Sequence, residues 1–291
     1  MISIILAAGC AHNIDDLKEA HRMSLLKESI QKIKNKKLFI FDLDGTVILG
    51  GRSIPYVKDF LELIKINHKQ IVFLSNNSSK IPLNHINLLN QIYDQIYDSS
   101  NIYTSIDNVL DALKERSIKT IYVLGVPEVI DYFKRKDYRI SEKPDAVIVT
   151  FDTSLTYETL SKVCLLFQQS TPPLYILSNP DLCYPSYNGY LPDAGSITAL
   201  INLVVNKKPD LICGKPSVSM LEGVLLKHPY NKDDCIFFGD RLYTDFTMGS
   251  EANISTILTL TGETKMGDLD LNFFKKNIVI NNFKEIIDMW Q

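Results

Sequence analysis

The sequence predicts an α/β protein built on a parallel sheet, with a second α/β domain inserted into it. Short β-branched or aromatic runs alternate with helical patterns from residue 37 to the end of the chain, which is typical of parallel sheets with helical crossovers. Polar residues follow several of these runs directly. One interval between two such polar segments is far longer than a single strand and helix require.

The strand candidates are the runs richest in Val, Ile, Phe and Tyr, and the helix candidates lie between them. We expect strands at 37–41, 70–74, 119–124, 145–150, 173–177, 234–238 and 255–259. We expect helices near 55–66, 82–93, 105–116, 127–136, 156–169, 196–206, 217–227 and 243–252. No repeat, low-complexity tract or Pro/Gly/Ser linker marks a domain boundary.

Residues 1–36 form an N-terminal extension to which the sequence assigns no role. The opening MISIILAAGC lacks the basic segment of a secretion signal. Its LAAG string is similar to the opening of sugar nucleotidyltransferases, but the Gly-x-Gly-x-Arg continuation is absent. We expect a short buried strand and then an amphipathic helix over 14–34. Its apolar positions include Ile14, Leu17, Leu25, Ile30 and Ile33. This extension is expected to pack or pair rather than to catalyse.

Composition narrows the class of partner. The chain has 291 residues, of which 45% are hydrophobic, and its formal net charge is −3, so it lacks the basic surface expected of a nucleic-acid binder or a membrane anchor. Five scattered cysteines contain no C-x-x-C pair, which favours the reducing cytoplasm over a disulfide framework. No apolar run reaches the roughly 18 residues of a membrane-spanning helix. We expect a small charged ligand, no nucleic acid and no membrane.

Three predicted strands end in polar residues. The run at 37–41 leads into Asp42, the run at 70–74 into Ser75, Asn76 and Asn77, and the run at 234–238 into Gly239 and Asp240. In open parallel sheets, ligands bind beyond the carboxyl ends of the strands, where helix N-termini also point. If these strands are neighbours, Asp42, Ser75 and Asp240 converge on one crevice.

Each polar segment has both a structural and a functional interpretation. Asp42 and Asp44 precede Gly45, and this pattern suits either an ordinary Asp-Gly turn or two carboxylates aimed into one space. The Ser75 hydroxyl and the amides after it suit either a helix cap or an anion site.

The two later segments are similarly ambiguous when each is taken alone. Lys215 in GKPS is either a solvated loop lysine or a cationic ligand. Asp240 and Asp245 in GDRLYTDF suit either the acidic N-terminus of a helix or a site for Mg²⁺, which prefers carboxylate and water oxygens.

Taken in order, the four segments resemble the motifs of the haloacid dehalogenase (HAD) superfamily of phosphatases. These motifs are DLDGT at 42–46, SNN at 75–77, GKP at 214–216 and GDRLYTD at 239–245. The last string, together with SNPD at 178–181 and PDAGSI at 192–197, is similar to the NagD-like or nitrophenylphosphatase group. The resemblance covers residues 37–291.

The spacing of the motifs indicates where the inserted domain lies. Asn77 and Lys215 are 138 residues apart, several times the length that one strand and helix require. The resemblance identifies the insertion as an α/β cap domain at 118–209. A Rossmann-like HAD core then comprises 37–117 and 210–291.

The resemblance implies Mg²⁺-dependent hydrolysis of a small-molecule phosphate monoester through an aspartyl-phosphate. Asp42 would be the nucleophile and Asp44 the general acid and base. The implied metal-binding residues are Asp42, Asp44 through its carbonyl, Asp240 and Asp245. The implied phosphate-binding residues are Gly45, Ser75, Asn76 and Lys215, and the implied substrate-pocket residues are Asn179 and Asp181. The partner would be a small phosphorylated metabolite, and cap-mediated homodimers occur in the family.

Other classes share part of this pattern. A phosphotransferase or mutase uses the same phosphoenzyme and differs only in the acceptor of the phosphoryl group. A phospho-accepting signalling domain lacks the acid two residues after its nucleophile, and a hydrolytic dehalogenase has no use for Asp44 or for the Asp240 and Asp245 pair. The acid at Asp44 therefore favours the phosphatase and phosphotransferase interpretations.

Overall fold

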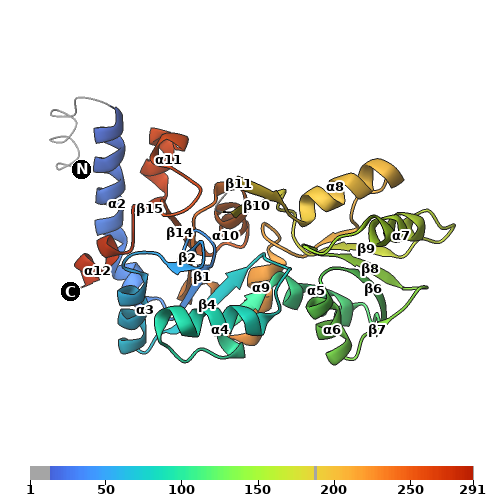
Figure 1. The fold of residues 1–291 in the computed structure, drawn as a ribbon. Helices are drawn as coiled ribbons and strands as arrows, with labels where there is room; N and C mark the ends of the chain where they lie inside the picture. Colours follow the sequence, from blue (N-terminus) through green and yellow to red (C-terminus); the bar gives the residue numbers. More distant parts are fainter. Residues whose placement is uncertain (1–13, 187–188, 291) are drawn as a thin grey trace. The chain divides into compact units, whose positions relative to one another are not determined.

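The computed structural model describes residues 14–186 and 189–290, and the chain divides into two compact units. One unit contains the chain up to Leu74 and from Leu225 onward, and the other is Ser75–Val224. Each unit contains its own parallel sheet (Figure 1), so the predicted α/β class is confirmed. The strand predicted within the first ten residues lies outside the described part of the chain.

The first sheet has the strand order β15-β14-β13-β1-β4-β5, and the neighbouring strands from β15 to β4 are parallel. Its strands are β1 (Leu38–Asp42), β4 (Gln70–Ser75), β5 (Ile102–Thr104), β13 (Cys235–Gly239), β14 (Ser255–Thr259) and β15 (Ile278–Ile280). Four of them match predicted strands. The three-residue strands β5 and β15 were missed, because runs this short show no recognisable strand pattern.

Aromatic side chains pack over one face of this sheet. Phe41 on β1 pairs with Phe238 on β13 in the strand register, and their rings stack with centroids 4.9 Å apart. Phe60, from helix α3 (Val57–Ile66), meets both rings edge to face. Offset and edge-to-face pairs are the favoured aromatic geometries. The cluster therefore fixes the register of β1 and β13, which end at Asp42 and Gly239.

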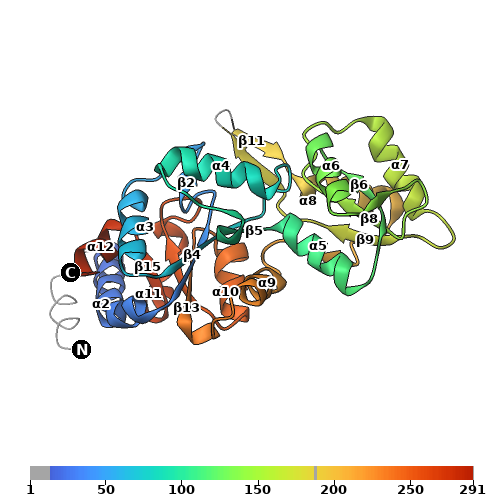
Figure 2. The same cartoon turned by 90° about the horizontal axis from the view of Figure 1, so that it is seen from below.

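The N-terminal helix packs against the C-terminal elements of the same unit. Helix α2 (Ile14–Asn35) confirms the predicted helix over 14–34 and contacts α11 (Leu271–Lys276), β15 and α12 (Lys284–Trp290) (Figures 1 and 2). The exposed fraction of Ile14 is 59%, whereas Leu26 and Ile33 are buried. The extension thus packs, as expected, but its apolar positions are not all on the packed face.

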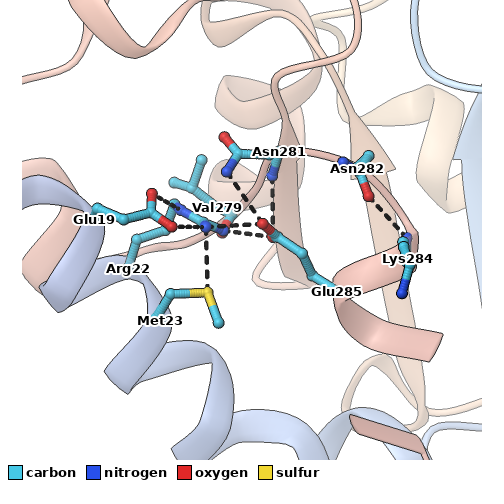
Figure 3. A network of polar contacts seen from close by, with 8 residues as sticks. All are labelled: Glu19, Arg22, Met23, Val279, Asn281, Asn282, Lys284 and Glu285. Atoms are coloured by element: carbon cyan, nitrogen blue, oxygen red, sulfur yellow. Dashed lines mark hydrogen bonds and ion pairs between the residues drawn. The ribbon is translucent and has the colours of Figure 1, made fainter. Parts of the chain in front are cut away.

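A buried arginine joins α2 to α12. Arg22 has no exposed surface, and Figure 3 shows its guanidinium group between Glu19 and Glu285. It donates to Glu19 Oε2 at 3.0 Å, to Glu285 Oε1 at 2.8 Å and to the carbonyl of Val279 on β15 at 3.2 Å. Burial opposes the charge, but hydrogen bonds to the two glutamates outweigh it and raise the pKa of Arg22. Through these ion pairs and hydrogen bonds, Arg22 links α2 to α12 and β15.

The second unit contains a sheet with the order β12-β9-β8-β6-β7, and again every neighbouring pair is parallel. Its strands are β6 (Thr120–Leu124), β7 (Arg139–Ile140), β8 (Ala146–Val149), β9 (Leu174–Leu177) and β12 (Leu211–Ile212). The three longer strands match predictions, and the two-residue strands β7 and β12 were missed.

Helices cover both faces of this second sheet (Figure 1). One face packs against α5 (Ser105–Glu115) and α6 (Pro127–Arg135) through residues such as Val109 and Phe133. The other face packs against α7 (Tyr157–Phe167) and α8 (Ala194–Val205) through Phe167 and Ile197. A parallel sheet covered on both faces requires the nearly uninterrupted apolar strands that the sequence shows.

The remaining elements are short or connect the sheets. They are the hairpin β2 (Ile48–Leu49) and β3 (Arg52–Ser53), α4 (Pro82–Tyr93), the antiparallel pair β10 (Cys183–Ser186) and β11 (Gly189–Pro192), α9 (Ser219–Lys227) and α10 (Thr247–Glu251). The 3₁₀ turns are η1 (Ser99–Asn101), η2 (Lys232–Asp234) and η4 (Met266–Asp268). The helix predicted over 243–252 is present, but it begins as a π-helical turn, η3 (Leu242–Phe246), and continues as α10. The short helices α11 and α12 were not predicted.

The expected domain boundaries stay a prediction. The strands of the second sheet lie between Thr120 and Ile212, close to the expected cap at 118–209, whereas the compact unit that contains them is the longer Ser75–Val224. No helix in the ranges 14–186 and 189–290 combines the length and the apolar character needed to cross a membrane.

Replacing Arg22 by Met should destabilise the first unit. The substitution leaves Glu285, whose side chain is 18% exposed, without its cation, and breaking a buried ion pair costs about 3 kcal/mol or more. Urea denaturation should show this loss in the free energy of unfolding. In Lys284→Ala, which removes an ion pair with both side chains about half exposed, the midpoint should hardly move. Equal midpoints for the two variants would contradict this role of Arg22.

Candidate functional site

The first group of predicted site residues lies at the carboxyl ends of β1 and β13. β1 and β13 are parallel neighbours, with Phe41 opposite Phe238. Asp42 and the Gly239–Asp240 segment therefore lie side by side at the carboxyl-terminal edge of the sheet. β4, which pairs with β1 on its other side, ends at Ser75. The expected neighbourhood of these three strands is therefore confirmed.

Asp42, Asp240 and Asp245 form a compact cluster of carboxylates. One oxygen from each lies within 4.8 Å of the others, and the exposed fractions of the three residues are 4%, 1% and 0%. Three buried carboxylates this close repel one another, which raises the free energy of the ionised cluster. A hard divalent cation suits the site, since such ions prefer carboxylate oxygens and offset this repulsion. This donor set fits a metal centre.

Asp245 lies in the π-helical turn η3, which places it in the cluster. A π turn inserts an extra residue into a helical turn and is frequently found at functional sites. Here Asp245 accepts a hydrogen bond from the backbone N–H of Arg241 at 3.2 Å. A Cβ atom on Gly239 would collide with the Asp245 side chain, so the glycine before Asp240 lets Asp245 pack against the strand end.

The turn after β1 supplies further contacts to the cluster. The Thr46 hydroxyl lies 3.5 Å from Asp42 Oδ2 and 3.4 Å from Asp240 Oδ1. Gly45 has a φ of +97°, and a Cβ there would come within 2.7 Å of the Asp240 carboxyl carbon, so both its conformation and its surroundings require glycine. Asp44 is partly exposed and begins the turn that leads into the β2–β3 hairpin.

A loop at residues 261–264, which no sequence motif marked, holds Asp240 in place. The backbone N–H of Glu263 donates to Asp240 Oδ2 at 2.6 Å, and that of Thr264 donates to the Asp240 carbonyl at 3.2 Å. The Thr261 hydroxyl donates to the carbonyl of Gly45 at 2.7 Å. Backbone donors offset the negative charge of the carboxylate. Residues 261–264 are therefore part of the site.

One signal in the sequence could have found this loop. It follows the predicted strand 255–259, and β14 lies beside β13, so its carboxyl end shares the edge that carries Asp240. Its residues, TGET, contain no acidic pair or lysine to mark them as chemical. The loop acts mainly through backbone N–H groups, which every sequence carries.

The second group of predicted site residues meets inside the second unit. Asn76 pairs with the backbone of Lys215: the Lys215 N–H donates to Asn76 Oδ1 at 2.8 Å, and Asn76 Nδ2 donates to the Lys215 carbonyl at 3.2 Å. The Ser75 hydroxyl accepts from the backbone N–H of Asn77 at 3.1 Å. Lys215 is 3% exposed and Ser75 is 1% exposed, so neither behaves as a solvated loop residue.

Asn179 and Asp181, expected in the substrate pocket, are both hydrogen-bonded within this group. Asp181 Oδ2 accepts from Asn76 Nδ2 at 2.9 Å and from Asn179 Nδ2 at 3.3 Å. Asn179 also donates to Asp193 Oδ1 at 3.0 Å and accepts from the Ser78 hydroxyl at 2.7 Å. These residues join the segments around Asn76 and Lys215 to the segment that follows β9.

A buried histidine supports the Ser75–Asn77 segment. His85 on α4 is 3% exposed and hydrogen-bonds with the backbone of Asn77. Within the described part of the chain, its Nε2 atom has no hydrogen-bond partner. Burial, assisted by nearby Lys80, lowers the pKa of His85 from 6.5 to about 4. The ring is therefore neutral at pH 7.

Replacing Gly262 by Ala should weaken metal binding. A Cβ at position 262 would come within 2.5 Å of the Asp240 carboxyl carbon and displace that carboxylate. Changes next to metal ligands typically cost about 10- to 100-fold in affinity, so titration calorimetry with Mn²⁺ should show a loss of that size. Gly267→Ala is the matched control, because a Cβ there meets nothing within 4 Å. Equal affinity in both folded variants would exclude the assigned role of the loop.

The buried His85 predicts a pH dependence of stability. Because its pKa is lower in the folded chain, the unfolded chain binds more protons between pH 6.5 and about 4. Its contribution to stability is complete above pH 6.5 and is lost as the pH falls toward 4, by about 3 kcal/mol in all. Denaturation at pH 7.5 and 4.5 should therefore show a stability difference between the wild type and His85→Gln that shrinks at low pH. A constant difference would contradict the neutral buried ring.

Comparison with known families agrees with this geometry. Residues 39–139 match the sequence profile of the haloacid dehalogenase-like hydrolases, and residues 212–286 match a HAD-hydrolase-like profile. The first match contains Asp42, Asp44 and Asn76, and the second contains Lys215, Asp240 and Asp245. The two profiles thus include every predicted site residue except Asn179 and Asp181, which lie between the two matches.

Individual relatives cover most of the chain. A solved structure of a 4-nitrophenylphosphatase from Thermotoga maritima is 35% identical, with a TM-score of 0.83 over 89% of this chain and 99% of that one. A 4-nitrophenylphosphatase from Schizosaccharomyces pombe is 29% identical over 84% of this chain and 91% of its own length. The ribonucleotide monophosphatase NagD from Escherichia coli is 27% identical over 86% and 98%, respectively. With this identity and coverage, and with its aspartate cluster at the strand ends, the chain belongs to the haloacid dehalogenase-like hydrolases.

Proposed function

We propose that this protein is a Mg²⁺-dependent phosphatase that hydrolyses small phosphorylated metabolites through an aspartyl-phosphate. The observation that carries the proposal is the buried cluster of Asp42, Asp240 and Asp245 at the ends of neighbouring parallel strands. The names of the relatives, two 4-nitrophenylphosphatases and a ribonucleotide monophosphatase, support the same class of reaction.

In the first step, Asp42 acts as the nucleophile. One of its carboxylate oxygens attacks phosphorus, an O–P bond forms, and the bond from phosphorus to the leaving oxygen breaks. Asp44 donates its proton to that leaving oxygen, so the product departs as an alcohol. Covalent catalysis of this kind divides one difficult displacement into two easier ones. It requires Asp44 to be protonated while Asp42 is ionised.

In the second step, water replaces Asp42 on phosphorus. Asp44, now a carboxylate, accepts a proton from the water as the water oxygen attacks the aspartyl-phosphate. The bond between phosphorus and Asp42 breaks, inorganic phosphate leaves, and Asp44 is protonated again. The site thereby returns to its starting protonation state. Partly exposed Asp44 suits this exchange better than the buried Asp42.

Both steps bring a carboxylate to a phosphate that already carries negative charge. We propose that Asp42, Asp240, Asp245 and the carbonyl of Asp44 hold Mg²⁺, with Glu263 and Thr264 fixing Asp240 through their backbone N–H groups. Bound Mg²⁺ offsets the charge between nucleophile and phosphate. The phosphoryl oxygens are bound by the Lys215 ammonium group, the Ser75 hydroxyl and backbone N–H groups near Gly45 and Asn76.

The inserted domain and the location of the enzyme bear on which substrate it uses. The α/β cap at 118–209 would exclude water and select the leaving group. Scattered cysteines and the charge balance favour a cytoplasmic enzyme acting on a small metabolite, and a homodimer remains part of the proposal. A panel of phosphorylated metabolites, with ribonucleoside monophosphates among them, would identify the substrate.

Replacing the two reacting carboxylates tests the mechanism directly. With Mg²⁺ present, the wild type should release phosphate from p-nitrophenyl phosphate, and a chelator should abolish the activity. Asp42→Asn should lower kcat by roughly 10³-fold or more, because the nucleophile is lost. Asp44→Asn should lower it by about 10²- to 10⁴-fold, the range typical of general acid–base catalysis.

A trapping experiment distinguishes the two roles. With a phosphoryl donor, acid quenching should recover the phosphoryl group on the wild-type protein but not on Asp42→Asn. Asp59→Asn, which changes an aspartate in the first turn of α3, is the control and should keep wild-type turnover. Undiminished hydrolysis by Asp42→Asn would refute the assignment of the nucleophile.

A further inference from the structure

The side chain of Asn76 is fully engaged by neighbours in the second unit. An amide side chain has two N–H donors and one carbonyl acceptor. The two hydrogens on Asn76 Nδ2 point to Asp181 Oδ2 at 2.9 Å and to the Lys215 carbonyl at 3.2 Å, while Oδ1 accepts from the Lys215 N–H at 2.8 Å. No side-chain proton of Asn76 is left for a phosphate, so only its backbone N–H is available to an anion.

Asn76 forms hydrogen bonds with both backbone polar groups of Lys215. They engage both the N–H and the carbonyl of Lys215, as a neighbouring β-strand would. The preceding Gly214 packs against the backbone of Asn179, where a Cβ would come within 2.7 Å of Asn179 Cα. The backbone of Lys215 is thus held from two directions, and the origin of its side chain is fixed.

Asp181 completes this arrangement by orienting the amide. If the Asn76 amide rotated by 180°, its carbonyl would face the Asp181 carboxylate and its N–H groups would face the N–H of Lys215. Both contacts would then be repulsive. Asp181 is only 9% exposed and is itself held by Asn179, which also donates to Asp193. A buried carboxylate held in this way selects one orientation of Asn76.

We propose that Asn76 and Asp181 are positioning residues that set the location of the Lys215 ammonium group. The resemblance to relatives suggested phosphate contact for Asn76 and a substrate-pocket role for Asp181, whereas their hydrogen bonds support an indirect role through Lys215. This inference rests on the proposed function, in which Lys215 binds the phosphoryl oxygens. An error of about 1 Å in a catalytic group can cost about 100-fold in rate.

A double-mutant cycle separates positioning from direct contact. Asn76→Ala and Asp181→Asn should each lower kcat/KM for p-nitrophenyl phosphate by about 10- to 100-fold. In a Lys215→Ala background, Asn76→Ala should cost less than about 2-fold more, because residues that act through one group are not additive. Inorganic phosphate affinity, measured by calorimetry, gives the same cycle without requiring turnover. Fully additive losses in both readouts would overturn the inference.

An exchange of the two side chains gives a second test. Asn76→Asp places two carboxylates in contact and should lower kcat/KM more than Asn76→Ala does. The double variant Asn76→Asp with Asp181→Asn restores an amide-to-carboxylate hydrogen bond in the opposite direction but not the hydrogen bond to the Lys215 carbonyl, so its kcat/KM should rise above that of Asn76→Asp without reaching the wild-type value. No recovery, in a double variant with wild-type circular dichroism, would contradict the proposed contact.

Controls keep this inference separate from the proposed function. Asp210→Asn changes another carboxylate of the second unit, which accepts from the backbone N–H of Tyr175 at 2.7 Å and contacts none of these residues. It should keep wild-type kcat/KM. If the wild type itself releases no phosphate, the proposed function fails. If the wild type is active and Lys215→Ala is impaired while Asn76→Ala and Asp181→Asn are unchanged, only the positioning role fails.

Discussion

The first unit depends on one electrostatic constraint, the close approach of three buried carboxylates at the end of a parallel sheet. Asp42, Asp240 and Asp245 present oxygens within 4.8 Å of one another, an arrangement that is costly unless hydrogen bonds and a cation offset the repulsion. Several neighbouring features bring these carboxylates together or offset their repulsion. Gly45 leaves room for the carboxylate of Asp240, a π-helical turn brings in Asp245, and the backbone N–H groups of the 261–264 loop hold Asp240.

Backbone register delivers these carboxylates to one point. Parallel strands in register end at the same edge, and the stacked rings of Phe41 and Phe238 fix the register of β1 and β13 one residue before the functional segment. The apolar core therefore contributes to the site by determining where the polar residues at the strand ends lie. The same principle holds in the second unit, where packing of Gly214 against Asn179 and the amide of Asn76 fix the backbone of Lys215.

The N-terminal helix is integrated into the first unit by a charge rather than by a purely apolar stripe. Arg22 is fully buried between Glu19 and Glu285 and also contacts the carbonyl of Val279. A buried guanidinium with several acceptors specifies one packing arrangement, because other arrangements leave a charge without partners. Helix α2, to which the sequence assigned no role, thus helps to hold the edge strand β15 and the helix α12 in place.

The sequence alone determined the α/β class, seven strands of the two parallel sheets and most helices, and it marked the candidate site residues. These features follow from local pattern: apolar runs predict strands, and aspartate, serine and lysine at their ends mark candidate chemistry. Only the tertiary structure revealed the 261–264 loop, the π-helical delivery of Asp245, and the pairing of Asn76 with Asp181 and Lys215. Backbone N–H groups are the same in every residue, and partners more than 100 positions apart leave no local pattern. Their roles are decided by which segments the folded chain brings together.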